Sequence, residues 1–298
     1  MDRCNFISLF LITTSLSVAI GRGKGKQIYM FFANVLFVLL THNNVTKKIF
    51  CFLLCYTAAD IRVSRVKRIA GGKDSDENEF PFQVSLRYSD TVHICGGALI
   101  SERHVLSAAH CVCELFDEPY DDLSVVTGSI SVKKGGKYHK VKSIHCHPEY
   151  AFGAEDSWTH DLVVITLNDN VTVSSSQEPI DLPNSDTFEN VSAILTGWGR
   201  HHSLGPLSDI LQKVTLTTIT NEKCQSYYNN TILPSHLCTL EHKGIGACKG
   251  DSGSPLIYNN QIIGIFSWTK PCAVGSPDVY TRVYQFIDFI RNATQYED

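Results

Sequence analysis

The sequence lacks the features that mark several other classes of protein. It has no repeat of fixed period and no low-complexity tract, and no apolar run reaches the roughly 18–20 residues that a helix needs to cross a bilayer. Charged residues make up only 19% of the 298 residues, against 43% hydrophobic residues. This composition argues against a disordered, collagen-like or coiled-coil protein.

Basic residues are scarce in the larger part of the chain. Residues 1–68 hold ten of the 26 Lys and Arg and two of the 30 Asp and Glu, which leaves residues 69–298 with 16 bases and 28 acids. Phosphate binding depends mainly on Lys and Arg, so we expect no nucleic acid as a partner. Cysteines, in contrast, are many, and the 11 of them indicate an oxidising compartment.

Three apolar runs occupy the first part of the chain. Residues 6–20 follow a basic residue and end near small residues, which is typical of a secretory signal. Three interpretations stay open: one signal with a long pro-segment, a signal-anchor helix, or a true start at Met30. We expect residues 1–68 to be a signal and pro-region that is removed, and residues 69–298 to be a secreted, extracellular domain.

From residue 80 onward, short runs rich in Val, Ile, Thr and aromatic residues alternate with clusters of turn-forming residues. This pattern predicts an all-β fold, as a sandwich or as barrels. Residues 284–295 instead place Phe286, Phe289 and Ile290 at helical spacing. We therefore expect a C-terminal helix that packs one face on the body.

Three segments contain the residue types that acyl transfer to water requires. His110 lies beside a cysteine in SAAHC, Asp161 stands at the head of an apolar strand, and Ser252 lies in the Gly-rich turn GDSG. Each has an ordinary structural explanation by itself. Together, in the order His, Asp, Ser, they match a nucleophile, its base and a carboxylate that orients the base.

Further motifs extend this pattern through residues 69–298: IAGG, PFQVSL, CGGALI, LSAAHC, HDLVVITL, TGWG, GACKGDSGSPL and PDVYTRV. With them the segment resembles a chymotrypsin-family serine protease, and within that family the insect chymotrypsin-like enzymes. The resemblance implies two six-stranded antiparallel β-barrels with the active site in the cleft between them. It also implies a secreted endopeptidase that hydrolyses peptide bonds through an acyl-enzyme.

The resemblance assigns each catalytic role to a residue. Ser252 would be the nucleophile, His110 its general base, and Asp161 the group that holds the imidazole. The backbone N–H groups of Gly250 and Ser252 would form the oxyanion hole.

The boundary at residue 68 implies activation by cleavage. In this family, cleavage before an IAGG-type motif frees an α-amino group that pairs with the acid preceding the nucleophile, here Asp251. We therefore expect a zymogen cut between Arg68 and Ile69. A trypsin-like enzyme would cut there, and because Arg65 and Lys67 also precede the bond, a furin-type convertase is a second candidate.

The resemblance places Gly246 at the base of the S1 pocket, where trypsins carry Asp. Asp278 and Thr269 stand where many members have Gly. Three outcomes stay open: Asp278 accepts a basic P1 residue, Asp278 is tied up by hydrogen bonds, or Asp278 and Thr269 together favour smaller apolar groups. We expect a chymotrypsin-like or broad P1 preference, with elastase-like or trypsin-like specificity as alternatives. Ser267, Trp268 and Thr269 would pair with the substrate backbone.

The family pattern implies three disulfides: Cys95–Cys111, Cys224–Cys238 and Cys248–Cys272. Cys113 and Cys146 remain, either as a fourth bridge or as free thiols. We expect no metal at His145-Cys146-His147, because neighbouring residues of a strand point to opposite faces. We also expect no calcium at the basic stretch 133–137 and no cofactor. Glycosylation sequons occur in the body at Asn170, Asn190, Asn229 and Asn292.

As partners we expect protein or peptide substrates, an activating protease and protein inhibitors, with the enzyme itself a monomer. The alternative from another class is a catalytically silent homologue that acts as a binding protein, but all three triad residues are present. A protease of an immune or developmental cascade is a further alternative. Residues 1–68 hold only three cysteines, too few for the six-Cys module common there, so a digestive or venom role is favoured.

Overall fold

The computed structural model describes residues 27–32, 35–40 and 70–295, except 152, 154–156, 187 and 271. The first two ranges form a hairpin of their own, in which β1 (Gln27–Phe32) pairs antiparallel with β2 (Val35–Leu40). The expected signal at 6–20 and the cleavage site at Arg68 and Ile69 lie outside the described residues.

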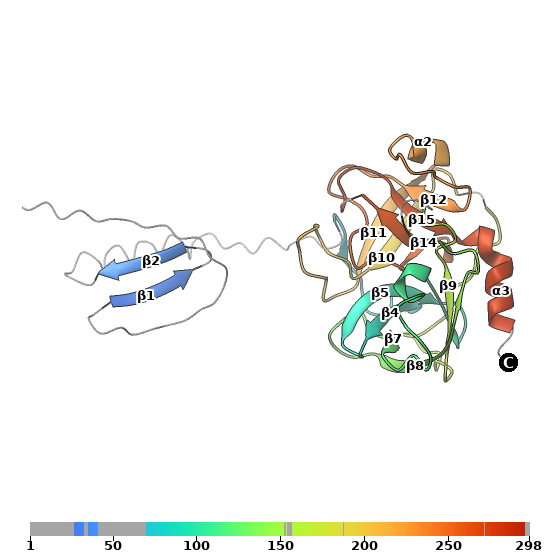
Figure 1. The fold of residues 1–298 in the computed structure, drawn as a ribbon, viewed down its shortest axis with the longest axis horizontal. Coiled ribbons are helices and arrows are strands. Elements are labelled where there is room, and N and C mark those ends of the chain that lie inside the picture. The colour runs from blue at the N-terminus through green and yellow to red at the C-terminus, as the bar shows by residue number, and fades with distance from the viewer. Residues whose placement is uncertain are drawn as a thin grey trace, which may run out of the picture. The chain divides into compact units, whose positions relative to one another are not determined.

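Six antiparallel strands close the first barrel in the order β4-β5-β6-β9-β8-β7. They are β4 (Gln83–Tyr88), β5 (Val92–Leu99), β6 (His104–Ser107), β7 (Leu123–Thr127), β8 (Lys137–Cys146) and β9 (Val163–Leu167). All five residues of β9 are buried, so both faces of this strand are covered. The reason is that the C-terminal helix covers the outer face of β9 while the barrel core covers the inner face (Figure 1).

The second barrel closes from β10, β13, β14, β15, β12 and β11, and the short strand β3 (Lys73–Asp74) adds to β11. Its strands are β10 (Ser192–Gly197), β11 (Gln212–Ile219), β12 (His236–Thr239), β13 (Pro255–Tyr258), β14 (Gln261–Thr269) and β15 (Asp278–Arg282). In β11, buried Val214 and Leu216 alternate with exposed Thr215 and Thr217. This alternation is typical of a strand with one face on a core.

Helices are few and short: the 3₁₀ turns η1 (Ala109–Cys111) and η2 (Val283–Phe286), and the helices α2 (Asn221–Gln225) and α3 (Ile287–Gln295). The predicted C-terminal helix is confirmed, with Phe286 and Ile290 buried against the first barrel. The sequence did not predict α2, because five residues give no apolar periodicity. Its signal is the N-cap, where the Thr220 hydroxyl accepts a hydrogen bond from Lys223 N–H.

The all-β prediction of two six-stranded barrels is confirmed. In Figure 1 the first barrel lies below the second, and the strands that carry the candidate site meet at the seam between them. Within the residues that the structure describes, no helix has the length and apolar character needed to span a membrane.

Candidate functional site

His110 is fixed at the seam by the first barrel. It lies in η1, directly after β6, and the Cys95–Cys111 disulfide ties this turn to β5. Only 15% of its side chain is exposed, and its Nδ1 lies 2.8 Å from Asp161 Oδ2. The indole of Trp158 packs edge-on against the imidazole at 5.8 Å between ring centres. The ring therefore has one orientation, with Nδ1 toward the carboxylate.

Asp161 is fully buried at the head of β9 and is held by four hydrogen bonds. Its carboxylate accepts from His110 N–H (2.9 Å), from His110 Nδ1 and from the Ser267 hydroxyl (2.5 Å), and its backbone carbonyl accepts from the Thr281 hydroxyl (2.8 Å). Ser267 lies at a β-bulge, where the pairing of β14 with β15 skips one residue. Bulges re-aim side chains beside active sites, and this one brings a second-barrel hydroxyl to a first-barrel carboxylate.

The two charges of this pair stabilise each other. Burial lowers the pKa of His110, but the charge and hydrogen bond of Asp161 outweigh it and raise that pKa above its ordinary value. Burial also favours the neutral form of Asp161, yet His110 and Ser267 hold the pKa of its carboxyl below the usual range. At neutral pH, Asp161 is therefore an anion aimed at the imidazole.

Ser252 reaches the same place from the second barrel. A cavity of about 440 Å³ is lined by both Ser252 and His110, and its other walls come from the first barrel, including Phe116 and the Cys95–Cys111 disulfide. The Ser252 carbonyl accepts a hydrogen bond from Gly96 N–H at 2.8 Å, which links the nucleophile loop to β5. The structure thus brings Ser252 and His110 to one cavity, and Asp161 is buried behind His110, hydrogen-bonded to its Nδ1.

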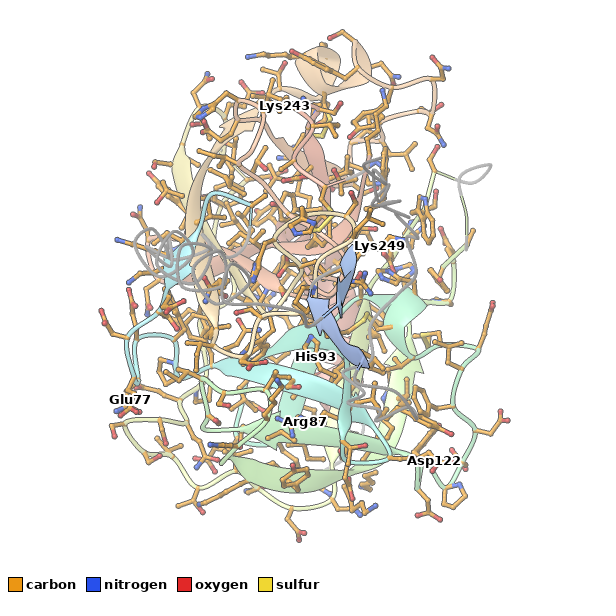
Figure 2. The ribbon with its side chains drawn as sticks, turned by 90° about the vertical axis from the view of Figure 1, so that its left-hand side faces the viewer. Glu77, Arg87, His93, Asp122, Lys243 and Lys249 are labelled. Carbon is orange, nitrogen blue, oxygen red and sulfur yellow. A yellow bond between two sulfur atoms is a disulfide. The ribbon has the colours of Figure 1, made fainter. Side chains whose placement is uncertain are left out.

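Gly250 begins the tight turn before Ser252. Its φ of +97° lies in the left-handed region, and a Cβ built on it would lie 2.3 Å from a methyl carbon of Leu207. Only glycine fits both conditions. Lys249, Gly250's neighbour, lies at the seam with His93 just below it (Figure 2), and His93 Nε2 lies 3.0 Å from the Gly250 carbonyl oxygen.

The side chain of Asp251, the next residue, points into the protein and is fully buried. Its carboxylate accepts hydrogen bonds from Gly199 N–H (2.8 Å) and Cys248 N–H (3.0 Å). Burial raises the pKa of this carboxyl to about 7, with a smaller contribution from the nearby Asp278, despite those two hydrogen bonds. A buried carboxyl of this kind stabilises any cation that reaches it.

Gly246 and Asp278 lie together at the predicted pocket base. Asp278 Oδ2 accepts a hydrogen bond from Ala247 N–H at 2.7 Å and would lie 2.7 Å from a Cβ on Gly246. Its side chain therefore fills the space above the glycine. Asp278 is buried, and burial raises the pKa of its carboxyl to about 7.

The predicted rim of the pocket is the end of β14. Thr269 pairs with Asp278 across β14 and β15, and Trp268 packs edge-on against Tyr228 at 4.7 Å between ring centres. Ser267 belongs to the same end of β14, and its hydroxyl donates a hydrogen bond to Asp161 of the His110–Asp161 pair.

Four disulfides are present among the described residues: Cys95–Cys111, Cys224–Cys238, Cys248–Cys272 and Cys113–Cys146. The fourth resolves the alternatives that the sequence left open and joins the segment after His110 to the end of β8. Cys95, Cys111 and His110 lie within 4.8 Å of one another, an arrangement that resembles a metal site. Both sulfurs are used in the disulfide, so they are not available as thiolate ligands.

Sequence reasoning missed several residues of the site. Trp158 and Thr281 brace the His110–Asp161 pair; Thr281 lies in the PDVYTRV motif, but nothing in that motif connects it with Asp161, and Trp158 lies in no quoted motif. Arg87, Ser85 and His93 form a buried hydrogen-bonded chain to the Gly250 carbonyl. The only sequence signal for this chain is two polar residues at alternate positions in an otherwise buried strand.

Comparison with known proteins agrees with this geometry. The family model described as Trypsin matches residues 69–290. The chain is 37% identical to Chymotrypsin-2 of Vespa crabro over 75% of this chain and 98% of that protein, and 33% identical to Trypsin 5G1 of Aedes aegypti over 76% and 85%. A solved structure of neuropsin, a serine protease expressed in mouse brain, aligns with a TM-score of 0.69 and 26% identity over 75% of this chain and 99% of that one.

Proposed function

Since the chain belongs to the trypsin family and is a serine endopeptidase, we propose that Ser252, His110 and Asp161 are its catalytic triad, in an enzyme secreted as a zymogen. The observation that carries this proposal is the hydrogen-bonded His110–Asp161 pair beside Ser252 on one cavity. A neutral hydroxyl is a weak nucleophile, and an oriented imidazole is the base it needs.

The proposed reaction has two halves. Ser252 Oγ attacks the peptide carbonyl carbon while His110 Nε2 takes the hydroxyl proton, and Asp161 stabilises the imidazolium. The N–H groups of Gly250 and Ser252 bind the oxyanion. When the C–N bond breaks, the imidazolium gives its proton to the leaving amine. Water then attacks the acyl-enzyme by the same route, and Ser252 regains its proton.

Activation is proposed to follow cleavage after Arg68. The new ammonium group of Ile69 would pair with Asp251, whose buried carboxyl has an elevated pKa and only backbone N–H partners among the described residues. Arg65→Ala, with Arg68 kept, tests the activating enzyme. Unchanged processing in convertase-bearing cells would exclude a furin-type convertase and leave a trypsin-like one.

For specificity, we propose a chymotrypsin-like or broad P1 preference. Asp278 fills the space over Gly246 and is held by Ala247 N–H, which supports a shortened pocket over one with a free anion. Near neutral pH a carboxyl with a pKa of about 7 is partly uncharged. That favours apolar P1 side chains over basic ones, with elastase-like and trypsin-like preferences as the alternatives.

Secretion is supported by the four disulfides and by the signal-like residues 6–20. The four sequon asparagines, Asn170, Asn190, Asn229 and Asn292, are all exposed, so glycosylation during export is part of the proposal. Protein or peptide substrates, the activating protease and protein inhibitors remain the proposed partners of a monomeric enzyme.

The test is to cleave the purified chain after Arg68 and to profile P1 preference with a peptide library, using Ser252→Ala as the control. The cleaved wild type should release peptides with apolar P1 residues, and the variant should release none above background. Hydrolysis retained by Ser252→Ala would refute the assigned nucleophile. A library cut only after Arg and Lys would refute the specificity.

A further inference from the structure

A buried polar chain connects β4 to the proposed oxyanion hole. Arg87 Nε donates to Ser85 Oγ at 3.2 Å, Ser85 Oγ lies 2.8 Å from His93 Nδ1, and His93 Nε2 lies 3.0 Å from the Gly250 carbonyl oxygen. The three side chains are 2%, 1% and 7% exposed. In Figure 2, Arg87, His93 and Lys249 follow one another from the first barrel toward the second.

A β-bulge brings these residues to one face. Leu86 pairs with Cys95 across β4 and β5, but Arg87 pairs with His93, so the pairing skips Ile94. His93 therefore shares a face with Ser85 and Arg87, while Cys95 lies on the opposite face. That face meets the second barrel, where the His93 ring packs edge-on against Trp198 at 5.4 Å between ring centres.

The direction of each hydrogen bond follows from the groups that can only accept or only donate. The Gly250 carbonyl only accepts, so His93 Nε2 carries the proton and Nδ1 is the acceptor for the Ser85 hydrogen. The guanidinium of Arg87 only donates, so Ser85 Oγ accepts from it. The opposite tautomer would leave the Ser85 hydrogen without this acceptor and place a nitrogen lone pair against a carbonyl oxygen.

Arg87 also disfavours the charged form of the ring. Burial, with a smaller contribution from the positive charge of Arg87, lowers the pKa of His93 to about 4 against the opposing hydrogen bond to the Gly250 carbonyl. Among the described residues Arg87 forms no ion pair; besides Ser85, it donates to the Tyr138 hydroxyl at 2.8 Å and lies 5.4 Å from the centre of the Tyr138 ring. A buried cation without a carboxylate costs stability, so stability alone does not account for it.

We propose that Arg87 is a positioning residue for the oxyanion hole. By donating to Ser85 it directs the Ser85 hydrogen to His93 Nδ1, and the His93 Nε2–H bond to the Gly250 carbonyl holds the Gly250–Asp251 peptide. That fixes the backbone of Gly250 so that its N–H, in the preceding peptide, faces the substrate oxygen. This inference rests on the proposed function, in which the Gly250 N–H binds the oxyanion. It adds Arg87 as a residue that positions that N–H.

The first test is kinetic and uses the full chain cleaved after Arg68. Arg87→Met should lower kcat for amide substrates about 10-fold, short of the 10²–10³ that loss of an oxyanion donor causes, with KM changed less than twofold. The unfolding temperature should stay the same or rise, because a buried charge is removed. Arg87→Lys should restore kcat to within threefold, since lysine also donates to Ser85.

Two further variants test the route of the effect. Tyr138→Phe removes the other hydrogen-bond partner of Arg87 and should leave kcat unchanged. Ser85→Ala should match Arg87→Met, and the double variant should lose no more than either single change, because both act through His93. An unchanged kcat in Arg87→Met, or a loss explained by a lower unfolding temperature, would overturn the proposal.

The second test is independent of activity. The measurement is the ¹⁵N NMR spectrum of Ser252→Ala protein labelled with ¹⁵N-histidine, in which the two ring nitrogens of a neutral imidazole have well-separated chemical shifts. The His93 signals are those that disappear when His93→Gln is added. We expect a protonated Nε2 and an unprotonated Nδ1 at neutral pH. A protonated Nδ1 would contradict the inference even if the enzyme cleaves peptides as proposed, whereas an inactive wild type with the expected tautomer would count against the proposed function alone.

Discussion

The two barrels contribute buried carboxyls of opposite character. Asp161, at the head of a first-barrel strand, has a pKa below its usual range because His110 and Ser267 partner it. Asp251 and Asp278, in the second barrel, are equally enclosed, yet burial raises the pKa of each to about 7 because their hydrogen bonds come only from backbone N–H groups or a hydroxyl. The same degree of burial therefore leaves Asp161 ionised at neutral pH and Asp251 and Asp278 only partly ionised, and the difference is the imidazole beside Asp161.

This contrast indicates which half of the site is complete in the uncleaved chain. His110 and Asp161, the proposed base and its carboxylate, are already paired within the first barrel by bonds that need no new terminus. The nucleophile loop of the second barrel contains a carboxyl that gains most from an added positive charge. On the proposed activation route, cleavage would thus complete the second barrel and leave the first unchanged.

The largest expected effect comes from removing the charge of the first-barrel carboxyl. Asp161→Asn should lower kcat about 10⁴-fold, because an amide N–H facing His110 Nδ1 forces the wrong tautomer. The measurement is kcat on the cleaved enzyme at pH 8, with the unfolding temperature as the control for folding. Activity within tenfold of wild type would show that Asp161 does not orient the base.

The matching change in the second barrel should act only after cleavage. Asparagine at 251 still accepts from Gly199 N–H but cannot pair with an ammonium group. Asp251→Asn should therefore lower kcat of the cleaved enzyme about 10²-fold, through a displaced oxyanion hole, with folding intact. A cleaved Asp251→Asn enzyme as active as wild type would contradict the ion pair.

The pH dependence of the unfolding temperature tests the same comparison between the carboxyls of the two barrels. Because the folded-state pKa of Asp251 and Asp278 lies above the unfolded value of about 4, their contribution is full below pH 4 and is lost as pH rises through 7. In the uncleaved Ser252→Ala protein the unfolding temperature should fall on the order of 5 °C between pH 5 and pH 8. Asp251→Asn and Asp278→Asn should each flatten this slope, and a slope unaffected by either would refute the assigned pKa shifts.

The pocket carboxyl should make P1 preference depend on pH. As pH rises through 7, Asp278 ionises, so kcat/KM for a P1 Lys substrate should rise relative to a P1 Phe substrate, by about tenfold between pH 6 and pH 8.5. The ratio cancels the titration of His110, which acts on both substrates. Asp278→Asn should give a ratio independent of pH. A wild-type ratio that is already flat would place Asp278 outside the pocket chemistry.

The smallest expected effect concerns the hydroxyl that links the two barrels. Ser267→Ala removes one hydrogen bond to Asp161 and leaves the His110 bonds in place. At roughly 1 kcal/mol for such a bond, kcat should fall about fivefold with KM unchanged. A fall beyond a hundredfold would mean that Ser267, and not His110, is the main partner of Asp161.

Alternating short runs and turn clusters predicted an all-β fold and the C-terminal helix, and the resemblance carried by the motifs predicted the family and its two barrels. The buried chain to Gly250 was not predictable in this way. Residues 93 and 95 stand two apart and would share a face in a regular strand, but the bulge at Ile94 sends them to opposite faces. No local pattern identifies that bulge.

Pairing between distant residues was the other limit. The Cys113–Cys146 bridge needs the segment after His110 to reach the end of β8, and spacing alone left it open. The position of Asp278 over Gly246 depends on the register that pairs Asp278 with Thr269 across β14 and β15. Both are tertiary facts that composition and periodicity do not contain.

The hydrogen bond between Ala70 and Gly246 has a thermodynamic consequence. The carbonyl of Ala70, two residues after Arg68, accepts a hydrogen bond from Gly246 N–H at 3.1 Å, so the start of the body is joined to the floor of the pocket. Inhibitor binding in the pocket and ordering of the segment at Ala70 share this hydrogen bond. The two events are therefore thermodynamically linked, and each favours the other. A small competitive inhibitor seated in the pocket should slow hydrogen exchange of the Gly246 amide, and a shortened terminus that loses the Ala70 carbonyl should weaken that inhibitor.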